Sequence, residues 1–295
     1  MQDLVIEHSE SILLFAFLST VSLWIAKSFG YFQLQDSQGS NVPKVSFLQV
    51  LGIFSIYLIT MIIVGSAIAK FFYLLSTSFL SEETLYSPSY GPLLSSCVQL
   101  ITTFLAGLFV ILFCKGQKDR ASMLAIWKEH DSHVPIIKDM GFGILSWIIS
   151  FPIVLFVGEL FDFLVFLLFG LQQYEQVAVH YLKMSLSSSF LFAIALFVVV
   201  IAAPILEELL FRGFLLNFLK RYLGRMAAIL LTSIGFSFFH FSLSQKLGNI
   251  PLVASLFTLA LFLGFIYERQ RSLFAPIALH MIFNIVSVFR ILLSP

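Results

Sequence analysis

FLFAIALFVVVIAAPILEELLFRGFLLNFLKRYLG, residues 190–224, is a long apolar run that indicates a membrane protein. It is apolar enough and long enough to cross a bilayer as a helix, since about 20 apolar residues suffice. It nevertheless carries Glu207, Glu208 and Arg212. A charge at bilayer depth is costly, so ionisable residues inside a membrane helix indicate a functional site or a specific ion pair.

The composition of the whole chain agrees with a membrane protein. Charged residues make up 11% of the 295 residues and apolar types 59%, whereas an ordinary soluble domain has roughly 25% charged residues. So few charges exclude a water-soluble globule, and the many aromatic residues exclude a disordered chain. The sequence therefore predicts an all-α polytopic protein with the lipid bilayer as a partner. A net charge of +1 gives no reason to expect nucleic acid as a partner.

Eight apolar runs are candidates for membrane-spanning helices. They cover residues 11–32, 47–75, 93–114, 141–170, 187–220, 226–244, 250–267 and 272–292. We expect residues 1–140 to hold the first three helices and a polar cytoplasmic loop at 115–139, and residues 141–295 to form a catalytic helical bundle. The fourth run contains Glu159 and Asp162, which mark either a break or the outer end of a helix.

The distribution of Lys and Arg tests the count of eight. With the N-terminus outside, twelve basic residues fall in the inside loops and four in the outside loops, while Arg212 lies within a span. Such an excess is what the positive-inside rule requires. We therefore predict a multi-pass protein with both termini outside. The inside residues are Lys27, Lys44, Lys115, Lys118, Arg120, Lys128, Lys138, Lys220, Arg221, Arg225, Arg269 and Arg271.

The charged residues of the fifth run differ in their expected roles. Glu208 and Arg212 are four residues apart with the acid first, which is the favourable order for an ion pair on a helix. Glu207 lies about 100° around the helix from Glu208. We expect Arg212 and Glu208 to support the structure and Glu207 to face a cavity. Pro204 removes a backbone hydrogen bond, so it is expected to kink the helix and open that cavity.

The sixth and eighth runs carry further polar residues at a similar depth. His240 follows Phe236 by one turn, and His280 and Asn284 share one helical face. Counted from the inside basic residues at 1.5 Å per residue, Glu207, His240 and Asn284 lie about 20 Å deep and His280 about 13 Å. Three helices that bring polar groups to one layer predict a polar intramembrane cavity, formed by the C-terminal four helices.

Two kinds of hydrolytic chemistry fit these residue types. In the first, Glu207 and His240 share a water molecule as general bases, while His280 and Asn284 donate to an oxyanion. In the second, Glu207, His240 and His280 bind zinc and leave its fourth position for water. Carboxylate and imidazole groups serve in both, and we favour the site without a metal. Other intramembrane proteases are excluded because the sequence has no HExxH, no GxSG and no GxGD.

Three short motifs in order resemble the CAAX-protease and bacteriocin-processing (CPBP, or Abi) family. The chain has EExxxR at residues 207–212, FxxxH at 236–240 and HxxxN at 280–284, and the resemblance covers roughly residues 190–290. It implies an intramembrane endopeptidase like the type II CAAX prenyl endopeptidases. In that family the first glutamate and the FxxxH histidine are thought to activate water, and the last histidine and asparagine to form the oxyanion hole. Its members are often named metalloproteases, yet a metal-free mechanism also has support.

The resemblance also implies the partners and the location. The substrate is expected to be a membrane-associated protein or peptide, such as a bacteriocin leader, in a bacterial plasma membrane. Two other functions remain open: a non-catalytic immunity or scaffold protein of the same fold, and a small proton-coupled transporter in which Glu, His and Arg form a relay.

Overall fold

The computed structural model describes residues 2–34, 43–87, 89–129, 134–170 and 177–293. In these ranges the chain is almost entirely helical, and its only β-type pairing is an isolated bridge between Lys128 and Ser272. The predicted all-α polytopic fold is confirmed.

The helices follow the predicted apolar runs closely. In chain order they are α1 (Gln2–Ser28), α2 (Phe47–Leu58), η1 (Ile59–Val64), α3 (Gly65–Phe79), α4 (Glu82–Leu85), α5 (Tyr90–Lys115), α6 (Arg120–Trp127), α7 (Ile136–Phe169), α8 (Val177–Ser185), α9 (Ser189–Leu196), η2 (Phe197–Ala202), α10 (Ala203–Glu208), η3 (Leu209–Leu216), α11 (Asn217–Leu223), α12 (Arg225–Phe239), η4 (Leu243–Gly248), α13 (Asn249–Gln270) and α14 (Phe274–Leu293). The segments η1, η2 and η3 are π-helical, and η4 is a 3₁₀ helix.

Seven helical segments of the described chain are long and apolar enough to span a membrane. The remaining predicted run, the sixth, contains α12, which is apolar but only 15 residues long. At 1.5 Å per residue it extends about 22 Å, less than the roughly 30 Å of a hydrocarbon core. The number of membrane helices is therefore about eight, one of them short, in a multi-pass integral membrane protein.

The structure shows what two segments form that the sequence left open. The polar stretch 115–139 contains the short helix α6, which Asp119 caps by accepting a hydrogen bond from the backbone N–H of Ser122 at 3.0 Å; its residues 130–133 lie outside the described chain. The fourth run is one continuous helix, α7, so Glu159 and Asp162 mark no break and lie towards its C-terminal end.

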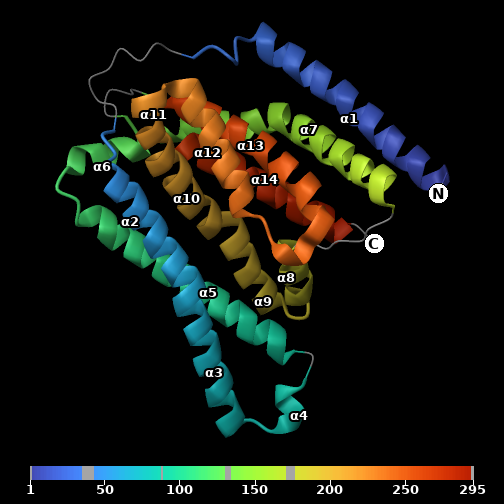
Figure 1. Ribbon diagram of the computed structural model, residues 1–295, viewed down its shortest axis with the longest axis vertical. Helices are drawn as coiled ribbons and strands as arrows, with labels where there is room; N and C mark the ends of the chain where they lie inside the picture. The colour runs from blue at the N-terminus through green and yellow to red at the C-terminus, as the bar shows by residue number, and fades with distance from the viewer. Residues whose placement is uncertain (1, 35–42, 88, 130–133, 171–176, 294–295) are drawn as a thin grey trace.

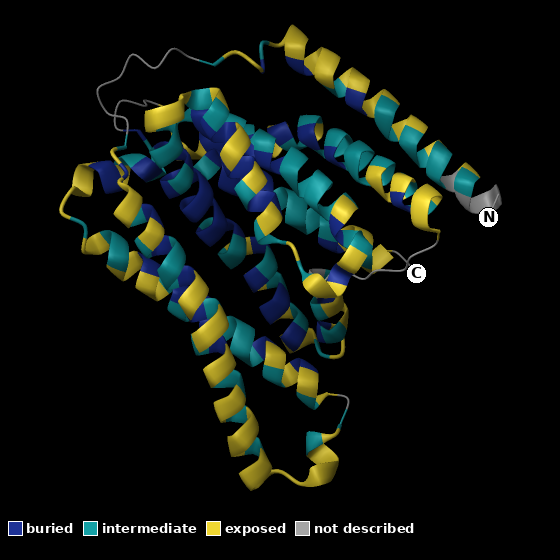
Figure 2. Ribbon diagram, viewed as in Figure 1, coloured by how far each residue is buried: buried dark blue, intermediate teal, exposed yellow. Residues whose placement is uncertain are grey.

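Helices α7, α10, α12, α13 and α14 lie together in the middle of the molecule, and Figure 2 shows the most buried residues there. Figure 1 shows α1 lying along α7 at the periphery, while α2, α3 and α5 form a long arm that ends near α4. Since α1 packs against α7 and α2 against η3, the two predicted regions 1–140 and 141–295 are in contact. Their division into domains stays a prediction.

Most of the Lys and Arg residues gather at one end of the bundle, here called the basic end: the helix ends and connections around Lys27, Lys115, Lys220 and Arg269. Contacts between these connections hold it together. Arg269 donates to the carbonyl oxygen of Gly30 at 2.9 Å. The other contacts are ion pairs of Glu268 with Lys220 (2.6 Å) and Arg225 (3.0 Å), and of Glu129 with Arg271 (2.9 Å).

Candidate active site

Three candidate residues from separate helices meet inside the bundle. Glu207 is on α10, His240 directly follows α12, and His280 is on α14. The Oε2 atom of Glu207 lies 3.7 Å from Nε2 of His240 and 4.0 Å from Nε2 of His280. It is buried, with no hydrogen-bond partner in the described part of the chain. A carboxylate oxygen thus faces two imidazole nitrogens across gaps too long for direct hydrogen bonds.

The other ring nitrogen of each histidine is held by an acceptor. Nδ1 of His240 lies 2.9 Å from the carbonyl oxygen of Phe236, and Nδ1 of His280 lies 2.9 Å from Oε1 of Glu208. Because a carbonyl and a carboxylate oxygen can only accept, both Nδ1 atoms carry the hydrogen. Each Nε2 atom then accepts a hydrogen bond when its ring is neutral and donates one when the ring carries a second proton. Glu207 Oε2 and the two Nε2 atoms therefore converge on one small volume.

Glu208 and Arg212 form a buried support beneath this site. The guanidinium Nη1 donates to Oε1 of Glu208 at 3.0 Å, and both side chains are fully buried. Nη2 of Arg212 donates to the carbonyl oxygen of Ala260 on α13 at 3.0 Å. The same guanidinium lies 4.6 Å from the centre of the Phe236 ring, which is a cation–π distance.

Phe236 links this support to both histidines. The centre of its ring lies 4.8 Å from that of His240 and 5.8 Å from that of His280. Phe236 is itself completely buried. One arginine and one aromatic ring on neighbouring helices thus limit the positions that the two imidazoles can take.

Asn284 lies one turn beyond His280 on α14. Its Nδ2 atom donates to the carbonyl oxygen of Val199 in η2 at 2.8 Å. One hydrogen of the amide group is therefore used, and the second stays available as a donor. Asn284 also lines the same cavity as Glu207, His240 and His280.

This cavity has a volume of about 860 Å³, within the range of pockets that bind small molecules and short peptide segments. Glu159 and Asp162 line it too, so their place towards the end of α7 puts them at the site. The cavity is also lined by polar residues that the sequence did not place at the site, which are Gln99, Tyr181, Ser242, Gln245, Ser255, Ser287 and Arg290.

The early end of α12 accounts for part of what the sequence analysis missed. The predicted sixth run reached residue 244, whereas the helix ends at Phe239 and η4 begins at Leu243. Ser242, Ser244 and Gln245 within five residues were the available signal that the helix ends early.

Zinc requires a tighter arrangement than these residues show. No group of three or more His, Cys, Asp or Glu side chains in the described ranges is arranged to hold a metal ion. Two ligand atoms on tetrahedral zinc, with bonds of 2.0 to 2.2 Å, lie about 3.4 Å apart. The separations of 3.7 and 4.0 Å from Glu207 both exceed that value, so these side chains lie too far apart to share one zinc ion as they stand.

Comparison with known proteins agrees with the geometry. A family model described as type II CAAX prenyl endopeptidase Rce1-like matches residues 187–286. The matched segment contains Glu207, His240, His280 and Asn284. The chain matches no curated protein and no solved structure.

Proposed function

We propose, on the premise that residues 187–286 belong to the Rce1-like family of type II CAAX prenyl endopeptidases, that this chain is an intramembrane endopeptidase. It would hydrolyse a peptide bond in a membrane-associated protein or peptide. The observation that carries the proposal is the approach of Glu207 Oε2 to the Nε2 atoms of His240 and His280, at 3.7 and 4.0 Å.

Glu207 Oε2 and Nε2 of a neutral His240 are two acceptors that suit a water molecule, which has two hydrogens to donate. A water between Glu207 and His240 would bridge a separation of 3.7 Å with two hydrogen bonds. Glu207 takes a proton as the water oxygen forms a bond to the scissile carbonyl carbon. The same proton then passes to the amide nitrogen and the C–N bond breaks, which releases an amine and a carboxylic acid. The second hydrogen of the water leaves the acid for the amine, so that the final products are a carboxylate and an ammonium group.

The oxyanion of the tetrahedral intermediate needs donors. Asn284 can donate its second amide hydrogen, and His280 can donate from Nε2 when its ring carries protons on both nitrogens. Glu207 and Glu208 are two buried carboxylates that face one buried cation, Arg212. A positive charge on His280, which lies between them, offsets the second carboxylate. We therefore assign His280 and Asn284 as the oxyanion donors.

Substitution of Glu207 by Gln tests the hydrolysis directly. The wild type and Glu207→Gln are expressed at equal levels in the same host membrane, and newly formed protein termini are identified by mass spectrometry. Cells are grown in H₂¹⁸O, so that hydrolysis puts ¹⁸O into each new C-terminal carboxylate. We expect labelled termini with the wild type and their loss with Glu207→Gln, because glutamine cannot accept the proton.

Glu83→Gln is the matched control, because Glu83 is an exposed residue of α4. It should give the wild-type set of termini. The same set with Glu207→Gln would overturn the proposal and favour a non-catalytic protein of the same fold.

A further inference from the structure

The segment that follows α12 lines the catalytic cavity with irregular backbone. The chain leaves α12 at His240, and Ser242 and then Gln245 of η4 line the same cavity as Glu207. Non-helical backbone at membrane depth is tolerated where it is buried in protein or lines a water-filled space. We call residues 242–249 the cavity loop.

A strained residue and a buried side chain fix the shape of the cavity loop. Lys246 has φ 46° and ψ −121°, and a positive φ is uncommon for a residue with a Cβ atom. The buried side chain of Asn249 holds the loop in this shape. Its Oδ1 accepts from the N–H of Ser242 at 3.0 Å, and its Nδ2 donates to the carbonyl oxygens of Ser242 (2.7 Å) and Lys246 (2.9 Å). Backbone strain of this kind persists where the surroundings impose it, and it gathers at binding and catalytic sites.

The cavity loop holds a buried amide oxygen that has no partner. Gln245 directly precedes Lys246, is 5% exposed and lines the cavity. Its Oε1 atom has no hydrogen-bond partner in the described part of the chain. Buried polar groups are nearly always paired, because an unpaired one lowers stability. The unpaired oxygen therefore indicates a partner that comes from outside the chain.

Other polar side chains of the cavity are already engaged. The hydroxyl groups of Ser255 and Ser287 each donate to a carbonyl oxygen one turn back in the same helix, at 2.8 and 2.9 Å. Two more lining residues, Glu207 and Tyr181, have a buried oxygen without a partner among the described residues. Glu207 is the proposed base, and the hydroxyl of Tyr181 lies close to Ser96 of α5.

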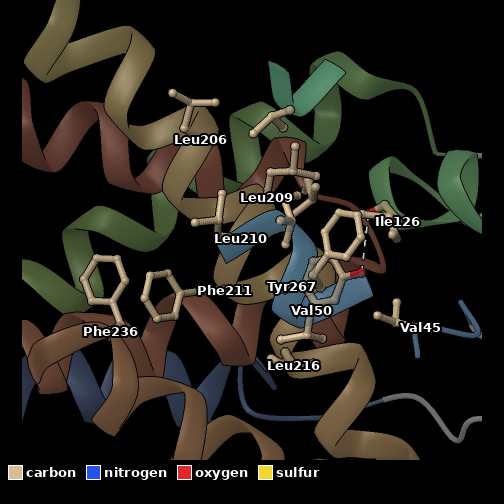
Figure 3. Close-up of a cluster of buried hydrophobic side chains, with 14 of the residues drawn as sticks. Val45, Val50, Ile126, Leu206, Leu209, Leu210, Phe211, Leu216, Phe236 and Tyr267 are labelled. Carbon is tan, nitrogen blue, oxygen red and sulfur yellow. Dashed lines mark hydrogen bonds between the residues drawn. The ribbon is translucent and has the colours of Figure 1, made fainter. Parts of the chain in front are cut away.

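Packed apolar side chains surround the segment that carries Glu207. Leu206, Leu209, Leu210 and Phe236 belong to one buried apolar cluster (Figure 3), and none of the four lines the cavity. This part of the bundle offers no polar side chain besides the catalytic ones to the main chain of a peptide in the cavity. Main-chain groups at membrane depth need partners, and Gln245 can supply them.

The carboxamide of a glutamine matches one residue of an extended peptide. In a strand the N–H and the C=O of one residue point the same way, and a partner can exchange hydrogen bonds with both. The last torsion of a glutamine side chain is broad, so rotation can turn Oε1 towards the N–H and Nε2 towards the C=O. A helical segment offers no such pair, because its main-chain groups are bonded within the helix.

From these observations we propose that Gln245 binds the main chain of the substrate inside the catalytic cavity, through hydrogen bonds to the N–H and the C=O of one extended residue. The proposal rests on the proposed peptidase function, which makes the bound peptide the substrate. Contacts to the main chain do not depend on the side chain at that residue. Gln245 therefore selects unwound segments rather than one particular sequence.

Peptide binding tests this role without any cleavage. Short overlapping fluorescein-labelled peptides that cover β-casein are bound to purified Glu207→Gln protein in detergent, and the Kd of the tightest is measured by fluorescence anisotropy. Gln245→Met is then added to this parent, because methionine has a similar length but no amide group. We expect Kd to rise about tenfold, since two hydrogen bonds between neutral groups are lost. The unfolding temperature should stay equal or rise, because Oε1 of Gln245 has no partner in the described part of the chain.

Gln117→Met is the matched control, because Gln117 does not line the cavity. Its Oε1 accepts from Nε2 of Gln49 at 3.0 Å, and its Nε2 donates to the carbonyl oxygen of Phe113 at 3.1 Å. This variant should have a lower unfolding temperature and an unchanged Kd. If Gln245→Met lowers the unfolding temperature as much as Gln117→Met does, its amide supports the loop instead of a peptide, and the proposal is overturned.

Methylation of single backbone nitrogens in the tightest peptide locates the contact. We expect one position at which N-methylation raises Kd several-fold for the parent but has no effect with Gln245→Met, because the lost N–H no longer has a partner there. Equal Kd values with and without Gln245→Met, the absence of such a position, or failure of every casein peptide to bind the parent would each overturn the proposal. If the ¹⁸O experiment detects no hydrolysis while binding still depends on Gln245, the peptidase function fails and the binding role stands.

Discussion

Asn284 on α14 supplies the hydrogen-bond donor that Val199 in η2 lacks, with Nδ2 2.8 Å from the carbonyl oxygen. In this π-helical stretch the N–H of Ala203 donates to the carbonyl of Val198, five residues earlier. By the same register the carbonyl of Val199 would pair with residue 204, which is proline and has no N–H. Pro204 and Asn284 are thus coupled through the carbonyl oxygen of Val199.

We predict that Asn284→Ala and Pro204→Ala are coupled in stability. Asn284→Ala leaves the carbonyl of the half-buried Val199 without this donor, which should lower the free energy of unfolding by about 0.5–1.5 kcal/mol. Adding Pro204→Ala restores an N–H to the helix, so the double variant should recover part of that loss. Unfolding in mixed micelles at increasing SDS measures all three variants as a double-mutant cycle.

Asn217→Ala is the matched control for that cycle. The Nδ2 atom of Asn217 donates to the carbonyl of Gly213 at 2.8 Å and to Tyr267 Oη at 2.6 Å, away from Pro204. Its loss of stability should be unchanged when Pro204→Ala is added. Strict additivity of Asn284→Ala and Pro204→Ala would show that the two residues do not share the carbonyl of Val199.

Arg212→Met should destabilise the protein strongly, because it leaves Glu208 as a buried carboxylate without its guanidinium partner. Breaking such a buried pair costs about 3–5 kcal/mol. Adding Glu208→Gln removes the unpaired charge, so the double variant should be more stable than Arg212→Met alone. The comparison is made by thermal unfolding of the purified protein in detergent, and a double variant that is less stable would contradict the prediction.

The sequence predicted more of the candidate site than of the structure around it. Depth along separate helices depends only on 1.5 Å per residue, so counting could place Glu207 and His240 in one layer. The same count put His280 at about 13 Å, nearer the membrane surface than Glu207. The partner of Asn284 was not accessible to counting, because it depends on a π-helical register that shifts each carbonyl by one residue. The short length of α12 was hidden for a similar reason, since Phe241 and Leu243 extend the apolar run beyond the helix.

Chelation should leave hydrolysis unchanged. The distances from Glu207 to the two histidines are longer than a tetrahedral zinc site requires, and the proposed mechanism uses only side chains and water. Purified protein is incubated with 1,10-phenanthroline and its metal content is measured, and hydrolysis of labelled casein in proteoliposomes is then followed. Stoichiometric zinc, together with activity that is lost on chelation and returns with Zn²⁺, would refute the metal-free mechanism.

Gly143→Ala should destabilise the bundle and slow hydrolysis together. A Cβ atom at Gly143 of α7 would overlap the backbone carbonyl oxygen of Ala275 and come within 3.0 Å of the Ala278 Cβ, both on α14. Backbone atoms cannot rotate away, so α14 must shift, and overpacking of this kind costs about 1–3 kcal/mol. The shift should also change the position of His280, on the same helix, relative to Glu207. Gly107→Ala in α5 is the control, because a Cβ there meets nothing within 4 Å, and alanine should add roughly 0.5–1 kcal/mol to helix stability. The unfolding temperature and the rate of casein hydrolysis are measured for both variants. Equal values for Gly143→Ala and Gly107→Ala would mean that α7 and α14 do not pack at this distance.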